Sequence, residues 1–261
     1  MKTMKSFMPQ SFTSIDDKQR LVLSFIGFCC GILWSHFIYI NYKRFRKQQL
    51  RGRRGGREDP VHMEKDVGTE GNLVSSTIHS LLTVSCSWIA VIYGNLWTGT
   101  FACTYSAGYM CWDIYAMIDI EYPDMKPLFL HHMCSGLSMI YIGCFESRAV
   151  WYACFLLITE STVPIKNYVD WIEGLKTDRN NVVPIWTRWL LLCTWILFRI
   201  VLFVPFALTA WREWHTFTST MKFLAFNGPF LFLFNIAGLF TVILKGFPWT
   251  TATETSRLKK L

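Results

Sequence analysis

The sequence predicts an all-α, polytopic membrane protein, a helical bundle of about seven transmembrane helices with six of them around a central cavity. The chain has 261 residues, of which 52% are hydrophobic and 17% charged, whereas a soluble domain of this length normally carries more charge. The apolar residues fall in blocks, most of them near the ~20 residues that span a bilayer. Basic residues gather between alternate blocks, as they do on the cytosolic side of membrane proteins.

Seven apolar blocks define the predicted spans. The first ends at a basic run and the second carries a stripe of hydroxyl side chains. The third contains an aspartate, the fourth begins with two histidines, and the short fifth holds a glutamate and a proline. The sixth is rich in aromatic residues and the seventh is interrupted by one asparagine. In order, the spans are Leu21–Tyr42, Leu73–Tyr93, Gly99–Ile118, Leu128–Phe145, Val150–Ile165, Trp186–Ala210 and Leu224–Leu244.

The basic run Lys43–Arg57 fixes the orientation. Beside a membrane span such a run favours the cytosolic side over a nucleic-acid or anionic-lipid site. The N-terminus is then lumenal, and seven crossings return the C-terminus to the cytosol. The polar, glycine-rich segment 51–71 predicts a flexible linker, so we expect the first helix to be peripheral.

Three regions follow from this topology: an N-terminal transmembrane helix and basic cytosolic linker at 1–72, the main transmembrane domain at 73–245 and a cytosolic tail at 246–261. The nine cysteines form no CxxC pair and predict small buried hydrophobes rather than a disulfide framework or a zinc site. We expect no metal, no cofactor and no cleaved signal peptide.

Ionisable side chains inside apolar spans predict the functional region. An ionisable group in hydrocarbon costs several kcal/mol by most estimates, so such groups usually face a protein interior or a water-filled cavity. By helix geometry His79, Asp113, the histidine pair and Glu160 lie within ~5–12 Å of one level. Asp113 is expected to pair with His79 or His132. Adjacent residues project about 100° apart on a helix. One of His131 and His132 can therefore point into the bundle as acid, base or nucleophile, and the alternative is that both are interfacial histidines near the membrane boundary.

Other polar residues leave two interpretations open. The stripe on the second span either lines a pocket or supplies interhelical hydrogen bonds. Pro164 removes the backbone donor to the Glu160 carbonyl, and Asn167 shares the face of Glu160. Arg199 needs a partner, which is a lipid head group, Glu160 or Asp113, and Asn235 indicates helix packing. The candidate catalytic residues are His131, His132, Asp113 and Glu160, and the candidate cavity or lipid-binding residues are His79, Ser80, Thr83, Asn167, Arg199 and Asn235.

Four short motifs, in this order and spacing, resemble the TLC-domain family. They are HS at His79–Ser80, GYMCWDI at Gly108–Ile114, LHH at Leu130–His132 and TESTVPIKN at Thr159–Asn167. The similarity covers about Leu73–Leu244 and is closest to the small TLC-domain-containing proteins. It implies a location in the endoplasmic reticulum or a related membrane and a helical bundle around a lipid-accessible cavity.

The resemblance also implies two functions from different classes. In the related ceramide synthases a His-His pair acts with two downstream aspartates, and a histidine is implicated in acyl transfer. His131 and His132 match the pair, but TESTVPIKN stands where the aspartates would be, and Glu160 is its only acidic residue. We therefore expect a lipid-homeostasis protein that binds a membrane lipid or acyl chain. The alternative is an acyltransferase that takes its acyl group from a thioester; no nucleic-acid partner is expected, and the oligomeric state is left open.

Overall fold

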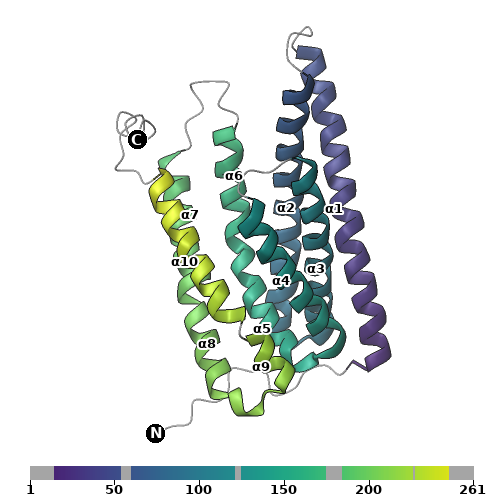
Figure 1. Cartoon of the computed structure of the whole chain (residues 1–261), viewed down its shortest axis with the longest axis vertical. Coiled ribbons are helices and arrows are strands. Elements are labelled where there is room, and N and C mark those ends of the chain that lie inside the picture. The colour runs from purple at the N-terminus through teal and green to yellow at the C-terminus, as the bar shows by residue number, and fades with distance from the viewer. Residues whose placement is uncertain (1–14, 54–59, 121–124, 175–183, 226, 247–261) are drawn as a thin grey trace. The chain divides into compact units, whose positions relative to one another are not determined.

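The computed structural model describes residues 15–53, 60–120, 125–174, 184–225 and 227–246, and these residues form helices and their connections with no strand among them (Figure 1). Four helical segments of this part of the chain are long and apolar enough to cross a membrane. The chain is accordingly an integral membrane protein. It divides into two compact units, residues 1–164 and 165–261, which are described separately.

Unit 1 contains the first five predicted spans. Its elements are α1 (Asp17–Arg53), α2 (Pro60–Tyr93), α3 (Leu96–Asp119), α4 (Met125–Phe145), α5 (Ser147–Leu157), the 3₁₀ segment η1 (Ile158–Thr162) and the start of α6 (Val163–Gly174). Gly94 adopts a positive φ of 63°, which lets the chain turn tightly from α2 into α3. Asn95 then caps α3, because its side chain accepts a hydrogen bond from the Thr98 amide.

Helix α3 is the central helix of unit 1. It packs against α1, α2, α4 and α5, and every residue from 102 to 110 is buried. Large apolar side chains such as Phe25 on α1, Leu81 on α2 and Leu137 on α4 are instead exposed. Exposed apolar surface of this kind on surrounding helices is what a bilayer would cover.

Close glycine contacts join α1 to α3. A Cβ atom on Gly31 would overlap the carbonyl oxygen of Tyr105, and one on Gly108 would overlap that of Phe28. Glycines at such positions let helix backbones approach closely in membrane proteins. The expectation of a peripheral first helix is therefore wrong, since α1 packs along the central helix of its unit.

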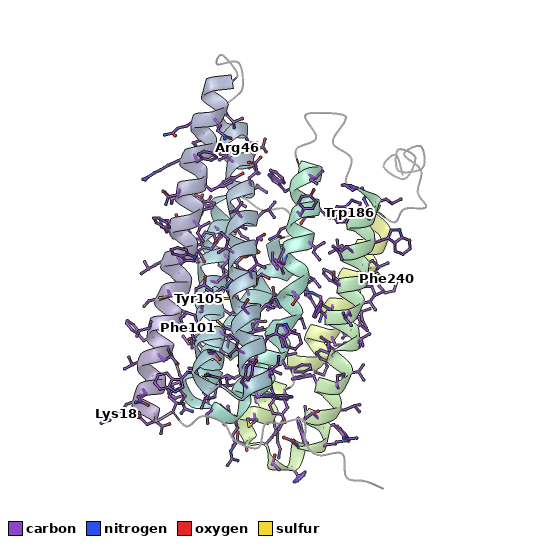
Figure 2. The ribbon with its side chains drawn as sticks, turned by 180° about the vertical axis from the view of Figure 1, so that it is seen from behind. Lys18, Arg46, Phe101, Tyr105, Trp186 and Phe240 are labelled. Atoms are coloured by element: carbon purple, nitrogen blue, oxygen red, sulfur yellow. The ribbon has the colours of Figure 1, made fainter. Side chains whose placement is uncertain are left out.

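The predicted linker at 51–71 is also largely helical. Residues 51–53 end α1 and residues 60–71 begin α2, with 54–59 outside the described residues. Glu70 on α2 joins the two helices, since its Oε2 atom accepts hydrogen bonds from Arg46 Nε and Tyr42 Oη, each at 2.9 Å. Figure 2 labels Arg46 near one end of α1 and Lys18 near the other. The amino-acid composition predicted a flexible segment at 51–71, because composition carries no information about these contacts between α1 and α2.

A break in helix geometry lies between α5 and α6. Pro164 cannot donate to the Glu160 carbonyl, and the backbone instead forms 3₁₀ turns over η1, with the Val163 amide bonded to Glu160 O. Ser80 on α2 donates a second hydrogen bond to the same carbonyl, at 2.6 Å. The Glu160 carbonyl, which Pro164 leaves without its usual helical donor, thus joins η1 to α2.

Unit 2 contains most of α6 and the last two predicted spans. The sixth span is one helical stretch formed by α7 (Ile185–Trp195), the π-helical η2 (Ile196–Val201) and α8 (Phe203–Arg212). The short η3 (Trp214–Thr216) follows, and the seventh span corresponds to α9 (Ser219–Ala225) and α10 (Asn227–Gly246). Val169, Leu191 and Trp195 form the apolar core of this unit.

Candidate functional site

The buried contact between α3 and α4 is centred on Asp113 and His132. His132 Nδ1 lies 3.2 Å from Asp113 Oδ2, and the two residues are 9% and 3% exposed. The atoms are at ion-pair distance, but the His132 ring is not aligned for a hydrogen bond. Of the two pairings expected for Asp113, the structure contains the one with His132.

The two adjacent histidines differ in their surroundings. His131 is half-buried, and its Nδ1 atom faces the Ser135 hydroxyl of its own helix at 3.4 Å. The two rings lie 5.5 Å apart, centroid to centroid. His132 faces the buried Asp113 carboxylate at ion-pair distance. The sequence could not decide which histidine would do so, because it does not fix the rotation of α4.

His79 is enclosed by α3 rather than paired with Asp113. Its ring stacks on Tyr109, with centroids 3.8 Å apart and planes 9° apart, and on Tyr105 at 5.4 Å. Its Nδ1 and Nε2 atoms each lie 3.4 Å from a hydroxyl, those of Thr83 and Ser106 respectively. His79 thus has two stacked tyrosine rings and a hydroxyl beside each of its ring nitrogens.

Tyr109 links these groups, and the sequence interpretation did not single it out. Its ring stacks on the His79 ring, with centroids 3.8 Å apart. Its ring meets the His132 ring edge-on, with centroids 6.5 Å apart. A signal was present, because Tyr109 and Asp113 are four residues apart and such residues share a helix face.

Glu160 contributes a backbone atom to this region. Its carbonyl oxygen accepts the Ser80 hydrogen bond, and Ser80 directly follows His79 on α2. The residue is only partly buried.

The remaining candidates lie in unit 2. Arg199 donates a 3.0 Å hydrogen bond to Asn235 Oδ1 and stacks on the Trp195 ring, 4.6 Å from its centroid. Trp195 donates to the Asn235 carbonyl at 3.0 Å. Arg199 was expected to pair with Glu160 or Asp113, which both belong to unit 1. The structure instead pairs it with Asn235, a residue that was expected to pack helices. Asn167 is buried on α6.

The chemistry available at Asp113 and His132 is that of an oriented imidazole. A carboxylate beside one ring nitrogen selects the tautomer that carries its proton there and makes the other nitrogen more basic. Such a ring acts as a general base or a nucleophile. Within the described ranges, no group of three or more His, Cys, Asp or Glu side chains is arranged to hold a metal ion.

Comparison with known proteins gives one match. The family model described as the TLC domain matches residues 71–250 of this chain, which includes every residue of the site. No curated protein and no solved structure matches the sequence.

Proposed function

The chain belongs to the TLC-domain family, and on this basis we propose that it is a multi-pass membrane protein of lipid homeostasis that binds or handles a lipid or acyl chain within the membrane. The observation that carries the proposal is the buried contact between His132 and Asp113. Two ionisable groups at the interface of membrane helices are costly to maintain, and intramembrane groups of this kind are generally functional.

The proposal includes the topology expected from the sequence. In this proposal the chain crosses the membrane seven times and holds a lipid-accessible cavity, with the N-terminus in the lumen of the endoplasmic reticulum and the C-terminus in the cytosol. The basic run Lys43–Arg57 supports this orientation, because such runs beside a membrane span favour the cytosolic side. Four of the helical segments are long and apolar enough to cross a membrane, and they support four of the proposed crossings.

The contacts divide the candidate residues into two roles. His132 and Asp113 handle the ligand, with His131, Glu160 and Asn167 as candidates for further ligand contacts. A second set is assigned to holding the helices together, because each member is hydrogen-bonded within its own unit. This set is His79, Ser80, Thr83, Arg199 and Asn235.

A second candidate function is acyl transfer, and the position of Asp113 at Nδ1 of His132 favours it. In this reaction Nε2 attacks the carbonyl carbon of an acyl thioester, the C–S bond breaks and the thiolate leaves, taking a proton from water. Asp113 stabilises the resulting acyl-imidazolium. An amine or hydroxyl acceptor then attacks the acyl carbon, the N–C bond to His132 breaks, and the acceptor's proton is released to water through a general base.

Binding is tested with purified protein in detergent and a photoactivatable fatty acid. Labelling that maps to α3 or α4 and is competed by natural lipid supports the proposal. Equal labelling of wild-type protein and the His132→Gln variant, with no competition, contradicts it.

Acyl transfer is tested separately, by incubating the protein with an acyl thioester and measuring intact mass. An adduct of one acyl group is expected in wild-type protein and in His131→Gln, and is expected to disappear in His132→Gln. The neighbouring histidine is a matched control because it has the same chemistry but is less buried, with its Nδ1 atom facing Ser135 of its own helix. Loss of the adduct in both variants would contradict the assignment to His132, and absence of any adduct would leave lipid binding as the function.

A further inference from the structure

A buried arginine lies at the end of unit 1 where α1 begins. Arg20 belongs to the first turn of α1 and is 8% exposed, whereas Asp17 and Lys18 in the same turn are exposed. Figure 2 labels Lys18 at this end of the helix. Arginine is almost never buried in a protein unless it is paired, so the burial of Arg20 indicates a partner for its guanidinium.

The ion pair that Arg20 forms does not supply that partner in full. Its Nη2 atom lies 2.8 Å from Asp17 Oδ1, but the Asp17 side chain is 87% exposed, and an exposed pair contributes little to stability. The Nε atom of the same guanidinium is buried and has no hydrogen-bond partner among the described residues. Because an unpaired buried donor on a charged group is costly, an acceptor for Nε from another molecule is indicated.

Two hydroxyl groups at the same end are also unpaired. Ser24 lies one turn after Arg20 on the same face of α1 and is 1% exposed, and Thr100 on α3 is fully buried. Neither hydroxyl has a hydrogen-bond partner within the described ranges. A Cβ atom on Gly143 of α4 would lie 3.6 Å both from Ser24 Oγ and from the Thr100 carbonyl oxygen. The face of α1 that meets α3 and α4 therefore offers donors for which the described chain provides no acceptor.

Apolar side chains lie directly beside these donors. Leu21, Val22 and Phe25 are all exposed large hydrophobic residues, and exposed surface of this kind on a membrane helix is covered by acyl chains. The polar residues 16–19 end where this apolar stretch begins. Arg20 thus lies at the boundary of the apolar helix, which is the level of the lipid head groups in a bilayer.

We infer that Arg20 binds the phosphate group of a membrane phospholipid, whose acyl chain lies along Leu21 and Phe25. A planar guanidinium donates to phosphate oxygens through two adjacent N–H groups, and the buried Nε atom supplies one of them. The weak exposed pair with Asp17 leaves the guanidinium available to a phosphate. Ser24 donates to a further oxygen of the same head group.

This site is separate from the one formed by Asp113 and His132. Asp113 follows Thr100 by thirteen residues on α3, which is about 20 Å along a helix. The inference therefore does not depend on the proposed function, and either can fail without the other.

The test uses a phosphatidic acid that carries a photoactivatable acyl chain, added to full-length protein in detergent, with the labelled residues located by mass spectrometry. Labelling of residues 21–26 is expected, and unlabelled phosphatidic acid is expected to compete with it. A diacylglycerol with the same acyl chains lacks only the phosphate and is expected not to compete. Competition by the diacylglycerol that equals that of phosphatidic acid would overturn the inference.

The matched variants are Arg20→Gln and Lys18→Gln, which remove the same charge from a buried and an exposed side chain of one helical turn. Labelling of residues 21–26 is expected to fall by about tenfold or more in Arg20→Gln and to stay within about twofold of wild type in Lys18→Gln. Unchanged labelling in Arg20→Gln, or an equal loss in both variants, would overturn the inference.

Two further measurements complete the design. Inorganic phosphate is expected not to displace the lipid, and displacement at the concentrations used for phosphatidic acid would assign the site to a free oxyanion and overturn the lipid assignment. Arg20→Lys replaces Arg20→Gln if that variant does not fold, since it keeps the charge but lacks Nε and the planar pair of donors. Labelling is expected to fall several-fold in Arg20→Lys, and wild-type labelling there would overturn the role of Nε.

Discussion

Ser80 Oγ donates a 2.6 Å hydrogen bond to the carbonyl oxygen of Glu160, the residue whose usual helical donor is replaced by Pro164. Ser80 and Pro164 are far apart in sequence. The Ser80 hydroxyl nevertheless donates to the Glu160 carbonyl oxygen, to which Pro164 has no N–H to donate. This relationship ties the second membrane helix to the turn between α5 and α6, and it predicts how the two positions respond to substitution.

Ser80→Ala is expected to lower the free energy of unfolding by about 1 kcal/mol, because it removes a partly buried interhelical hydrogen bond. Ser85→Ala is the control, since the exposed Ser85 hydroxyl bonds only to the Leu81 carbonyl of its own helix. Unfolding in mixed micelles measures both. The effect of Ser80→Ala is expected to shrink in a Pro164→Ala background, where the residue at 164 can donate to the same carbonyl. Equal effects of Ser80→Ala in the two backgrounds would show that the proline and serine are not coupled.

Asp113→Asn is expected to reduce lipid labelling or adduct formation by about a hundredfold, because an amide does not stabilise the charged imidazole as a carboxylate does. Membrane insertion and thermal stability are expected to change little. Asp119→Asn on the same helix provides the comparison: Asp119 bonds to Tyr39 Oη at 2.9 Å and lies 3.6 Å from Lys43 Nζ, away from His132. Wild-type activity in Asp113→Asn would remove Asp113 from the site.

Gly108→Ala is expected to destabilise unit 1 by about 1–3 kcal/mol, as overpacked sites do, even though alanine is the better helix former. The added methyl group would overlap the Phe28 carbonyl on α1. Gly136→Ala on α4 is the control, since its Cβ would meet nothing nearer than Met110 Cβ at 3.5 Å, and it is expected to be neutral or slightly stabilising. Thermal unfolding in detergent distinguishes the two, and equal melting temperatures would contradict close packing of α1 on α3.

The Arg46–Glu70 contact gives a charge-exchange prediction. Arg46→Glu or Glu70→Arg alone places like charges together and is expected to lower stability by about 1 kcal/mol, and the double variant is expected to recover most of this loss. Both side chains are largely buried, at 21% and 15% exposure, so moderate salt is expected to change the result little. A double variant no more stable than either single one would show that the pairing does not hold α1 to α2.

The helices were predictable from the sequence where a simple rule applied. The third apolar block was expected at Gly99–Ile118 and forms the helix α3 at Leu96–Asp119, because an apolar block of this length that follows a capping asparagine favours a helix. The role of the first helix was missed, although Gly27 and Gly31 in GFCCG have the small-residue spacing of helix contacts. That signal indicates close approach but does not name the partner helix.

The site was predictable only at the level of residue type. Asp113, His79 and His132 were all expected in one region, and the choice of partner required the rotation of each helix about its axis. Tyr109 was hidden because the chain contains 43 aromatic residues, by its counts of 12 Trp, 10 Tyr and 21 Phe. The partner of Arg199 depended on the π-helical turns of η2, a backbone irregularity that no sequence pattern used above predicts.

The central position of α3 has a consequence for biogenesis. This helix carries Asp113, which faces His132, and Ser106, which faces His79, and it is not among the helices of the described chain that are long and apolar enough to cross a membrane. A newly made α3 is then expected to remain at the translocon until its neighbours shield it, with α4, made after it, completing the enclosure. Premature release of a nascent chain ending before α4 would expose Asp113 to lipid, and quality-control degradation of that truncated product is the expected fate.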